Sequence, residues 1–243
     1  MEHVGGKRIL LTRAADDVRP WVERLSSLGA EGVSHPCISI ERLQLSDAWI
    51  THLDACDWVA FTSFRSVGFF ADMLDGETLA KQLIAAVGPS TQEAVRARFG
   101  RCDLTAPEGT AASLASTMKA RLTKRSKVLL PGPAEPRPEL SVALESCGAA
   151  TVPLPLYATR PAVRSGPKLN LTQTQLDAVI FASPSAVAGA MATADIPSEL
   201  PVACIGPSTA KAAQEAGLQK IYTSETRDLD GLLRALKIPL SKL

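Results

Sequence analysis

The strongest constraint on the fold of this chain is an internal duplication. The tetrapeptide Gly-Pro-Ser-Thr occurs at residues 88–91 and again at 206–209, each time after a short apolar run and before an Ala-rich, helix-like segment. A second pair of segments, 57–63 and 177–183, repeats at nearly the same interval. This interval is far longer than the roughly 20–50 residues of a solenoid repeat, so each copy is expected to be a domain-sized unit.

Length and composition agree with two globular units. The 243 residues suit two domains of roughly 100–120 residues each. Apolar residues make up 46% and charged residues 21%, which is typical of a water-soluble globular protein, and no apolar run is long enough to span a membrane. The net charge of +1 provides no field for holding a polyanion. We therefore expect neither nucleic acid nor membrane as a partner.

The cysteines and the start of the chain indicate a reducing compartment. The five cysteines are odd in number and form no C-x-x-C pair, so neither a disulfide framework nor a zinc site is expected, and Cys204 is assigned to a buried strand. The apolar run that follows the first residues is too short for the core of a secretory signal. The expected location is the cytoplasm, and the absence of coiled-coil heptads makes a monomer the expected state.

Short β-like runs alternate with helix-like stretches along the whole chain. The runs lie near residues 8–12, 31–35, 57–61, 84–87, 102–105, 127–130, 150–154, 178–181, 202–205 and 220–223. In 15–28 the apolar residues, Trp21 among them, recur at three- and four-residue steps, which indicates a helix packed on a sheet. Gly29 and Gly148 follow two such helices as left-handed caps. This pattern predicts an α/β fold with two similar parallel-sheet domains.

The domain boundaries are predicted from two polar gaps in matching places of the two copies, residues 36–56 and 155–176. If both gaps are crossings between domains, one discontinuous domain comprises 1–36 and 163–243. The other domain then comprises 37–162 and includes the linker strands. The pattern leaves this pairing open, and hinges are predicted at 36–42 and 155–163.

Hydroxyl-bearing turns follow four of the predicted strands. A helix start at the carboxyl end of a parallel strand presents unpaired N–H groups and the positive end of the helix dipole, which attract anions. The alternative interpretation of any one of these residues is an ordinary helix cap. The candidate anion-binding residues are Thr62, Ser63, Ser90, Thr91, Ser183, Ser185, Ser208 and Thr209.

Conventional catalytic motifs are missing from the sequence. It contains no G-x-G-x-x-G or G-x-x-x-x-G-K-[ST] phosphate loop, no H-E-x-x-H and no G-x-S-x-G, and its three histidines are scattered. His35, beside the first gap, is interpreted as an exposed residue. An enzyme of this composition is expected to act by holding and folding a reactive substrate, without a metal.

The order of these turns resembles uroporphyrinogen-III synthase. The resemblance covers nearly the whole chain and rests on Leu10-Leu11-Thr12-Arg13, Phe61-Thr62-Ser63, Val87–Thr91, Leu156-Tyr157-Ala158-Thr159, Phe181-Ala182-Ser183 and Ile205–Thr209. It implies two α/β domains joined by a two-stranded linker, with the active-site cleft between them. It also implies a cofactor-free enzyme that cyclises hydroxymethylbilane, inverting the last pyrrole ring and releasing water.

By the same resemblance, Tyr157 is the catalytic candidate and the hydroxyl-bearing turns bind substrate carboxylates. The phenol of Tyr157 would assist departure of the substrate hydroxyl. The alternative interpretation of Tyr157 is an aromatic residue packed on the linker with its hydroxyl at the surface. Arg13 is the preferred cationic partner of the substrate, ahead of Arg65 and Arg160. The sequence departs from the family pattern at 64–66, where it has Phe-Arg-Ser after Thr62-Ser63.

Two other classes of protein would share parts of this sequence pattern. A two-domain sensor or binding protein for a small acidic ligand would share the architecture, but the sequence shows no export signal, DNA-binding helix or basic patch. A two-domain glycosyltransferase would usually be longer and carry a nucleotide-recognition motif, which this sequence lacks.

Overall fold

The computed structural model describes residues 6–74, 79–163, 166–171 and 174–238. The helices are α1 (Ala15–Ser27), α2 (Ala48–Asp54), α3 (Phe64–Met73), α4 (Pro89–Phe99), α5 (Ala111–Lys119), α6 (Glu139–Ser146), α7 (Pro184–Thr193), α8 (Pro207–Glu215) and α9 (Leu229–Ala235). The strands are β1 (Arg8–Leu11), β2 (Glu31–Ser34), β3 (Ile38–Arg42), β4 (Trp58–Phe61), β5 (Leu83–Ala86), β6 (Leu104–Thr105), β7 (Lys127–Pro133), β8 (Ala150–Pro161), β9 (Leu169–Asn170), β10 (Ala178–Phe181), β11 (Ala194–Asp195), β12 (Val202–Cys204) and β13 (Ile221–Thr223). This alternation confirms the predicted α/β fold.

The chain forms two compact units. Unit 1 comprises Met1–Ile40 and Thr159–Leu243, and unit 2 comprises Glu41–Ala158. The chain leaves unit 1 along β3 and returns along β8, which is next to β3 in the order of the six-stranded sheet. The domains 1–36 with 163–243 and 37–162 stay a prediction, which independent folding of the two parts would test.

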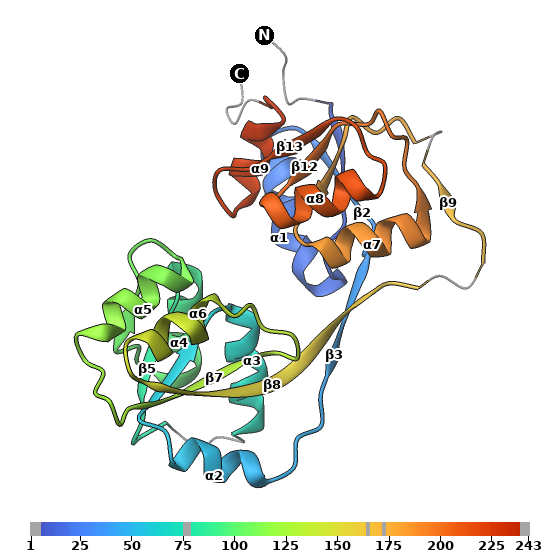
Figure 1. The fold of residues 1–243 in the computed structure, drawn as a ribbon. Coiled ribbons are helices and arrows are strands. Elements are labelled where there is room, and N and C mark those ends of the chain that lie inside the picture. The colour runs from blue at the N-terminus through green and yellow to red at the C-terminus, as the bar shows by residue number, and fades with distance from the viewer. Residues whose placement is uncertain (1–5, 75–78, 164–165, 172–173, 239–243) are drawn as a thin grey trace. The chain divides into compact units, whose positions relative to one another are not determined.

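Unit 1 is built on a five-stranded parallel sheet. Its order is β13-β12-β10-β1-β2, and every neighbouring pair is parallel. Figure 1 shows the blue N-terminal β1, α1 and β2 packed together with the orange and red C-terminal elements. The N-terminal and C-terminal segments of the chain therefore share one sheet, which is possible only because the chain returns to unit 1 along β8.

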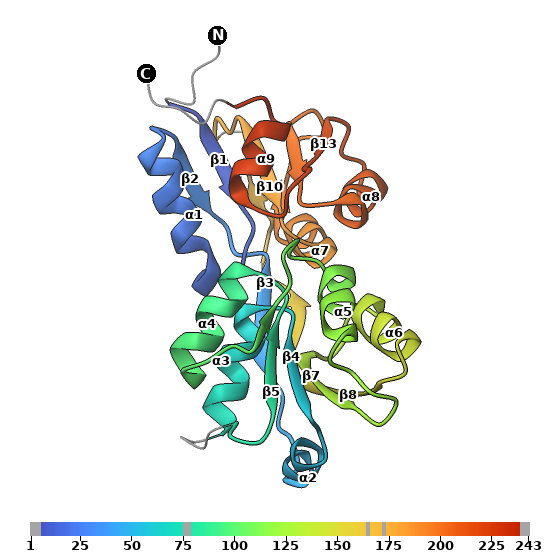
Figure 2. The same ribbon diagram turned by 90° about the vertical axis from the view of Figure 1, so that its left-hand side faces the viewer.

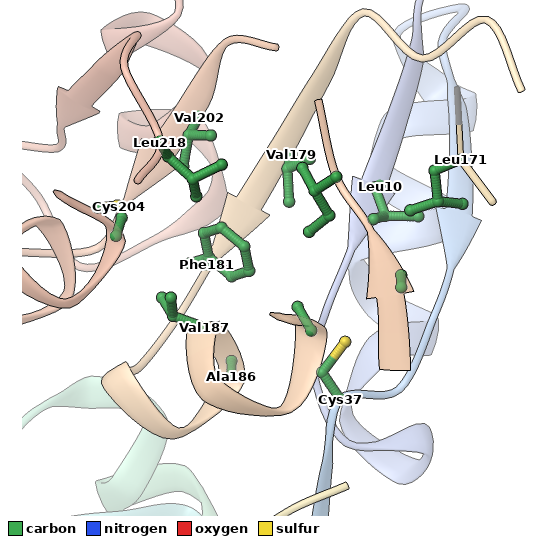
Figure 3. Packing of buried hydrophobic residues seen from close by; sticks show 14 residues of the cluster. Leu10, Cys37, Leu171, Val179, Phe181, Ala186, Val187, Val202, Cys204 and Leu218 are labelled. Atoms are coloured by element: carbon green, nitrogen blue, oxygen red, sulfur yellow. The ribbon is translucent and has the colours of Figure 1, made fainter. Parts of the chain in front are cut away.

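One face of this sheet packs against α7 and α8. Leu10, Val179 and Phe181 point to this face and are fully buried, together with Ala186 and Val187 of α7. Figure 3 shows the Phe181 ring beside the α7 side chains. Successive strand residues point to opposite faces, so an unbroken apolar strand such as β10 indicates a sheet that is covered on both sides.

The other face of the sheet packs against α1 and α9. Ile9, Leu11 and Ile180 alternate with the residues just named and contact the cluster that contains Leu25 and Leu232. Helices thus cover both faces, as the apolar strands predicted.

Unit 2 is built on a six-stranded sheet of order β3-β8-β7-β4-β5-β6, in which the strands from β8 to β6 are parallel. Figure 2 shows α3 and α4 on one side of β4 and β5, with α5 and α6 on the other. On the α3–α4 side, Phe61, Phe70 and Phe99 form an aromatic cluster with ring centroids 5.6 to 6.4 Å apart. Edge-to-face and offset arrangements of this kind are preferred by aromatic rings.

Several local predictions can be compared with the structure. Gly29 and Gly148 have φ of 83° and 88°, which confirms both left-handed helix ends. Trp21 packs partly buried against the α1–α9 cluster. The polar gaps that were predicted to be linkers contain β3 and α2 in 36–56, and the end of β8, to Pro161, in 155–176.

Candidate functional site

The predicted residues of unit 1 lie at one edge of its sheet. Arg13 follows β1, Ser183 and Ser185 follow β10, and Ser208 and Thr209 follow β12. Because β12, β10 and β1 are parallel neighbours, their carboxyl ends meet at the same edge. The structure therefore brings these five residues to one end of unit 1.

The corresponding residues of unit 2 lie at the carboxyl ends of two neighbouring strands. Thr62 and Ser63 follow β4, and Ser90 and Thr91 follow β5, which pairs with β4 in parallel. Thr62 and Ser90 are exposed, Ser63 is half-buried, and Thr91 is buried. The duplication thus reproduces the same edge in both units.

At two of the four helix starts, the side chain of the N-cap residue caps a backbone N–H group. Ser63 Oγ accepts a hydrogen bond of 3.1 Å from the N–H of Ser66 and lies 2.8 Å from Ser66 Oγ. Ser183 Oγ accepts a hydrogen bond of 3.2 Å from the N–H of Ala186. In α3 and α7 the cap interpretation therefore holds, and these two hydroxyls already satisfy backbone donors.

The two Gly-Pro-Ser-Thr helix starts have no side-chain cap. The N-cap residues of α4 and α8 are Gly88 and Gly206, which provide no side-chain acceptor, and each helix begins with Pro. Proline lacks an N–H group, so the remaining first-turn donors belong to the Ser and Thr that follow. Each unit consequently has a Gly-Pro-Ser-Thr helix start that no side chain caps, and the starts of α1, α2 and α6 also lack a side-chain cap.

Thr209 has an unusual environment. Its side chain is fully buried, and its hydroxyl oxygen has no hydrogen-bond partner among the residues that the structure describes. Its backbone N–H lies 3.1 Å from the carbonyl oxygen of Gly206. A buried hydroxyl without a partner destabilises the fold by about 1–3 kcal/mol, so such a group needs a separate explanation.

Tyr157 lies within β8 and is 5% exposed. Its ring stacks on the Phe69 ring, with centroids 5.3 Å apart and an interplanar angle of 26°. The guanidinium carbon of Arg65 lies 5.6 Å from the centre of the same ring. Arg65 and Phe69 are one turn apart on α3, so the ring lies along the first two turns of the helix that Ser63 caps.

The predicted cationic partners differ in their surroundings. The guanidinium of Arg13 lies 4.3 Å from the centre of the Trp21 ring and forms an ion pair of 3.5 Å with Asp17. These contacts hold Arg13 against α1 at the edge of the sheet. Arg160 is exposed near the end of β8.

A second group of contacts lies where the chain leaves and re-enters unit 1. The N–H of Ala162 donates a hydrogen bond of 2.8 Å to the carbonyl oxygen of Cys37, and a Cβ added to Gly189 would lie 1.7 Å from that oxygen. Figure 3 shows Cys37 beside α7. Thr193 Oγ1 lies 3.0 Å from Nε2 of His35, so that half-buried histidine is not simply exposed as predicted.

Sequence reasoning missed Phe69, Gly189 and Thr193. Their partners are distant in sequence, and no local pattern indicates the contact. A partial signal existed for Phe69, since it stands four residues after Arg65 on the predicted helix and such pairs share a face.

The buried thiols of Cys37 and Cys204 are unsuited to nucleophilic chemistry. Burial raises the pKa of both Cys37 and Cys204 to about 12, so these thiols stay protonated at neutral pH. Cys204 is fully buried in β12, as predicted.

Within the described ranges, no group of three or more His, Cys, Asp or Glu side chains is arranged to hold a metal ion. None of the helices described here has the length and apolar character needed to cross a membrane.

Comparisons of sequence point to one family. Residues 19–234 match the family model described as uroporphyrinogen-III synthase HemD. The chain is 27% identical over 252 residues to the uroporphyrinogen-III synthase of Synechococcus elongatus, covering 96% of this chain and 95% of that protein. It is 29% identical over 246 residues to the porphyrin biosynthesis protein HemD of Ruminiclostridium josui, covering 95% of this chain. The chain spans about half the length of that relative, 48%.

Comparisons of structure agree on the fold. The uroporphyrinogen-III synthetase of Helicobacter pylori superposes with a TM-score of 0.64 at 16% identity, covering 95% of this chain and 98% of the other. A uroporphyrinogen III synthase of Thermus thermophilus gives 0.58 at 20% identity, covering 96% and 98%.

The relatives favour the predicted enzyme of tetrapyrrole biosynthesis over the sensor or binding protein. The sequence match extends across both units, from α1 to α9, and therefore includes both Gly-Pro-Ser-Thr helix starts and Tyr157. The chain belongs to the uroporphyrinogen-III synthase HemD family.

Proposed function

We propose that the chain converts hydroxymethylbilane into uroporphyrinogen III, closing the macrocycle with inversion of the last pyrrole ring and loss of water. One observation carries the proposal: in this member of the family, each unit has a helix start with uncovered N–H donors at the carboxyl edge of a parallel sheet. The substrate carries acetate and propionate groups on its pyrroles. Helix N-termini stabilise such anions by about 0.3–1 kcal/mol each when exposed.

The proposed binding residues divide into two classes. Ser90, Thr91 and Ser208 would bind carboxylates through first-turn N–H groups and hydroxyls, and Thr209 through its hydroxyl, because its N–H already donates to the Gly206 carbonyl. Thr62 and Ser185 would add hydroxyls beside the capped starts of α3 and α7. Ser63 and Ser183 would act by shaping those starts, since their Oγ atoms already accept backbone N–H groups. Arg13 would add positive charge at the edge of unit 1.

The chemistry needs little covalent help from the protein. An electron-rich pyrrole expels its own hydroxyl, and the C–O bond breaks as that hydroxyl takes up a proton and leaves as water. The phenol of Tyr157 would assist this departure as a hydrogen-bond or proton donor. Binding would then direct the substituted carbon of the last ring to react first, giving a spirocyclic intermediate that reopens and recloses with the ring inverted.

An isomer assay tests the proposal. Purified protein is incubated with freshly made hydroxymethylbilane, and the oxidised products are separated by isomer. We expect the type III isomer to dominate, and Tyr157→Phe to lower kcat by about 10-fold or more while type III remains the product. A product that is only the spontaneous type I isomer, under several conditions, would contradict the function and favour an acidic-ligand binding protein.

We further propose a monomer that works in the cytoplasm with this small molecule as its partner and without a cofactor. The near-neutral net charge of +1 supports the absence of a polyanionic partner. Sedimentation of the purified chain would test the monomer.

A further inference from the structure

A column of stacked side chains surrounds Tyr157 in unit 2. Phe69 lies at the centre of this column. The Phe69 ring stacks on the Tyr157 ring, and the guanidinium carbon of Arg42 lies 5.2 Å from the centre of the Phe69 ring. Arg65 lies over Tyr157 at 5.6 Å. Cations over ring faces and offset stacked rings attract each other, so the four side chains form one continuous set of favourable contacts.

The Arg42 end of the column is anchored to α3 and, through it, to α4. Arg42 Nη2 lies 3.3 Å from Asp72 Oδ2 and 3.4 Å from the carbonyl oxygen of Phe69. The second carboxylate oxygen of Asp72 accepts from Arg98 of α4. Phe69 consequently joins Arg42 of β3 and Tyr157 of β8 to α3, the helix that Ser63 caps.

We propose that Phe69, supported by Arg42, is a positioning residue that fixes the Tyr157 phenol along the first two turns of α3. The inference rests on the proposed function, in which that phenol assists departure of the substrate hydroxyl. A proton donor is effective only within a narrow range of distance and direction, and a displacement of about 1 Å can cost a factor of about 100 in rate. Phe69 acts through Tyr157 and needs no contact with substrate.

A double-mutant cycle on kcat separates positioning from general packing. The variants are Phe69→Leu, Tyr157→Phe and the two together, each assayed for type III formation. We expect Phe69→Leu to lower kcat by about 10-fold with KM changed less than about twofold. In the Tyr157→Phe background the same change should cost less than about twofold, because residues that act through one group are not additive.

Two further variants support the cycle. Phe69→Tyr keeps a ring at the centre of the column and should restore kcat to within about twofold of the unaltered protein. Arg42→Gln alters a half-exposed residue outside the core, so it should leave folding intact while lowering kcat about threefold, again only when Tyr157 is present. Tyr222→Leu, on the edge strand β13, is the control for loss of an exposed aromatic and should leave kcat unchanged.

The outcomes distinguish the two proposals. Equal losses of kcat from Phe69→Leu in both backgrounds would overturn the positioning role and indicate packing alone. An unchanged kcat in Tyr157→Phe or in Phe69→Leu would also overturn it. In all these cases the proposed function stands as long as the unaltered protein forms the type III isomer. Failure of the unaltered protein to form that isomer is the separate result that removes the function itself.

Discussion

At the scale of single residues, Thr209 presents a conflict between stability and binding. Its hydroxyl is buried without a partner among the described residues, so Thr209→Val should raise the free energy of unfolding by about 1 kcal/mol. If the hydroxyl is kept for a substrate carboxylate, the same change should raise KM by about 10-fold. Urea unfolding and the isomer assay measure the two effects.

The matched control is the same substitution at Thr193, which is also buried in unit 1. Its hydroxyl donates a 2.7 Å hydrogen bond to the carbonyl oxygen of Gly189 and lies 3.0 Å from His35 Nε2. Thr193→Val should therefore lower the free energy of unfolding by about 1–2 kcal/mol. Equal destabilisation by both valines would show that the Thr209 hydroxyl has a structural partner after all.

At the scale of elements, α7 lies directly against the two segments that enter and leave unit 1. A Cβ at position 189 would lie 1.7 Å from Cys37 O and 2.9 Å from Ala162 N, both backbone atoms. Gly189→Ala should therefore destabilise the protein by about 3 kcal/mol, because neither segment can move without breaking their mutual hydrogen bond. The midpoint of urea unfolding measures this loss of stability.

Gly68→Ala in α3 is the control, because a Cβ at position 68 would have no neighbouring atom within 4 Å. This change should instead stabilise the protein by about 0.5–1 kcal/mol. Equal and small effects at both positions would contradict this packing.

The same elements show what sequence could and could not predict. The left-handed Gly29 and Gly148 and the Gly-Pro-Ser-Thr helix starts depend on local backbone rules, and these were predicted correctly. The local pattern ended this strand at 154, because Pro155 indicates a strand break, although the buried Leu154 and Leu156 alternate with Pro153 and Pro155 as strand residues do. Only the family resemblance implied a linker strand beyond that point.

Side-chain partners were harder to predict than elements. The stack of Phe69 on Tyr157 joins α3 to β8, and no periodicity in either segment specifies which aromatic meets which. The same holds for Gly189 against Cys37, where the sequence shows only a glycine in a helix of small residues. Such contacts are set by tertiary packing, which a local pattern does not encode.

At the scale of the whole molecule, the discontinuity of unit 1 predicts how the chain can be divided. Residues 38–161 contain all of β3 and β8 and the aromatic cluster of unit 2, so this fragment should unfold cooperatively by itself. The complementary chain needs only a short linker in place of the excised segment, because Cys37 and Ala162 are joined by a backbone hydrogen bond of 2.8 Å. Thermal unfolding followed by circular dichroism tests both.

Neither fragment should form the type III isomer alone, because each retains only one of the two Gly-Pro-Ser-Thr helix starts and only the fragment 38–161 retains Tyr157. Positioning by several weak anion contacts fails when half of them are removed, even though each remaining contact is unchanged. The fragments should therefore be folded and inactive. A fragment that unfolds without a cooperative transition would show that the units are not independent domains. Selective type III formation by one folded fragment would show that the turns of a single unit suffice to direct the ring inversion.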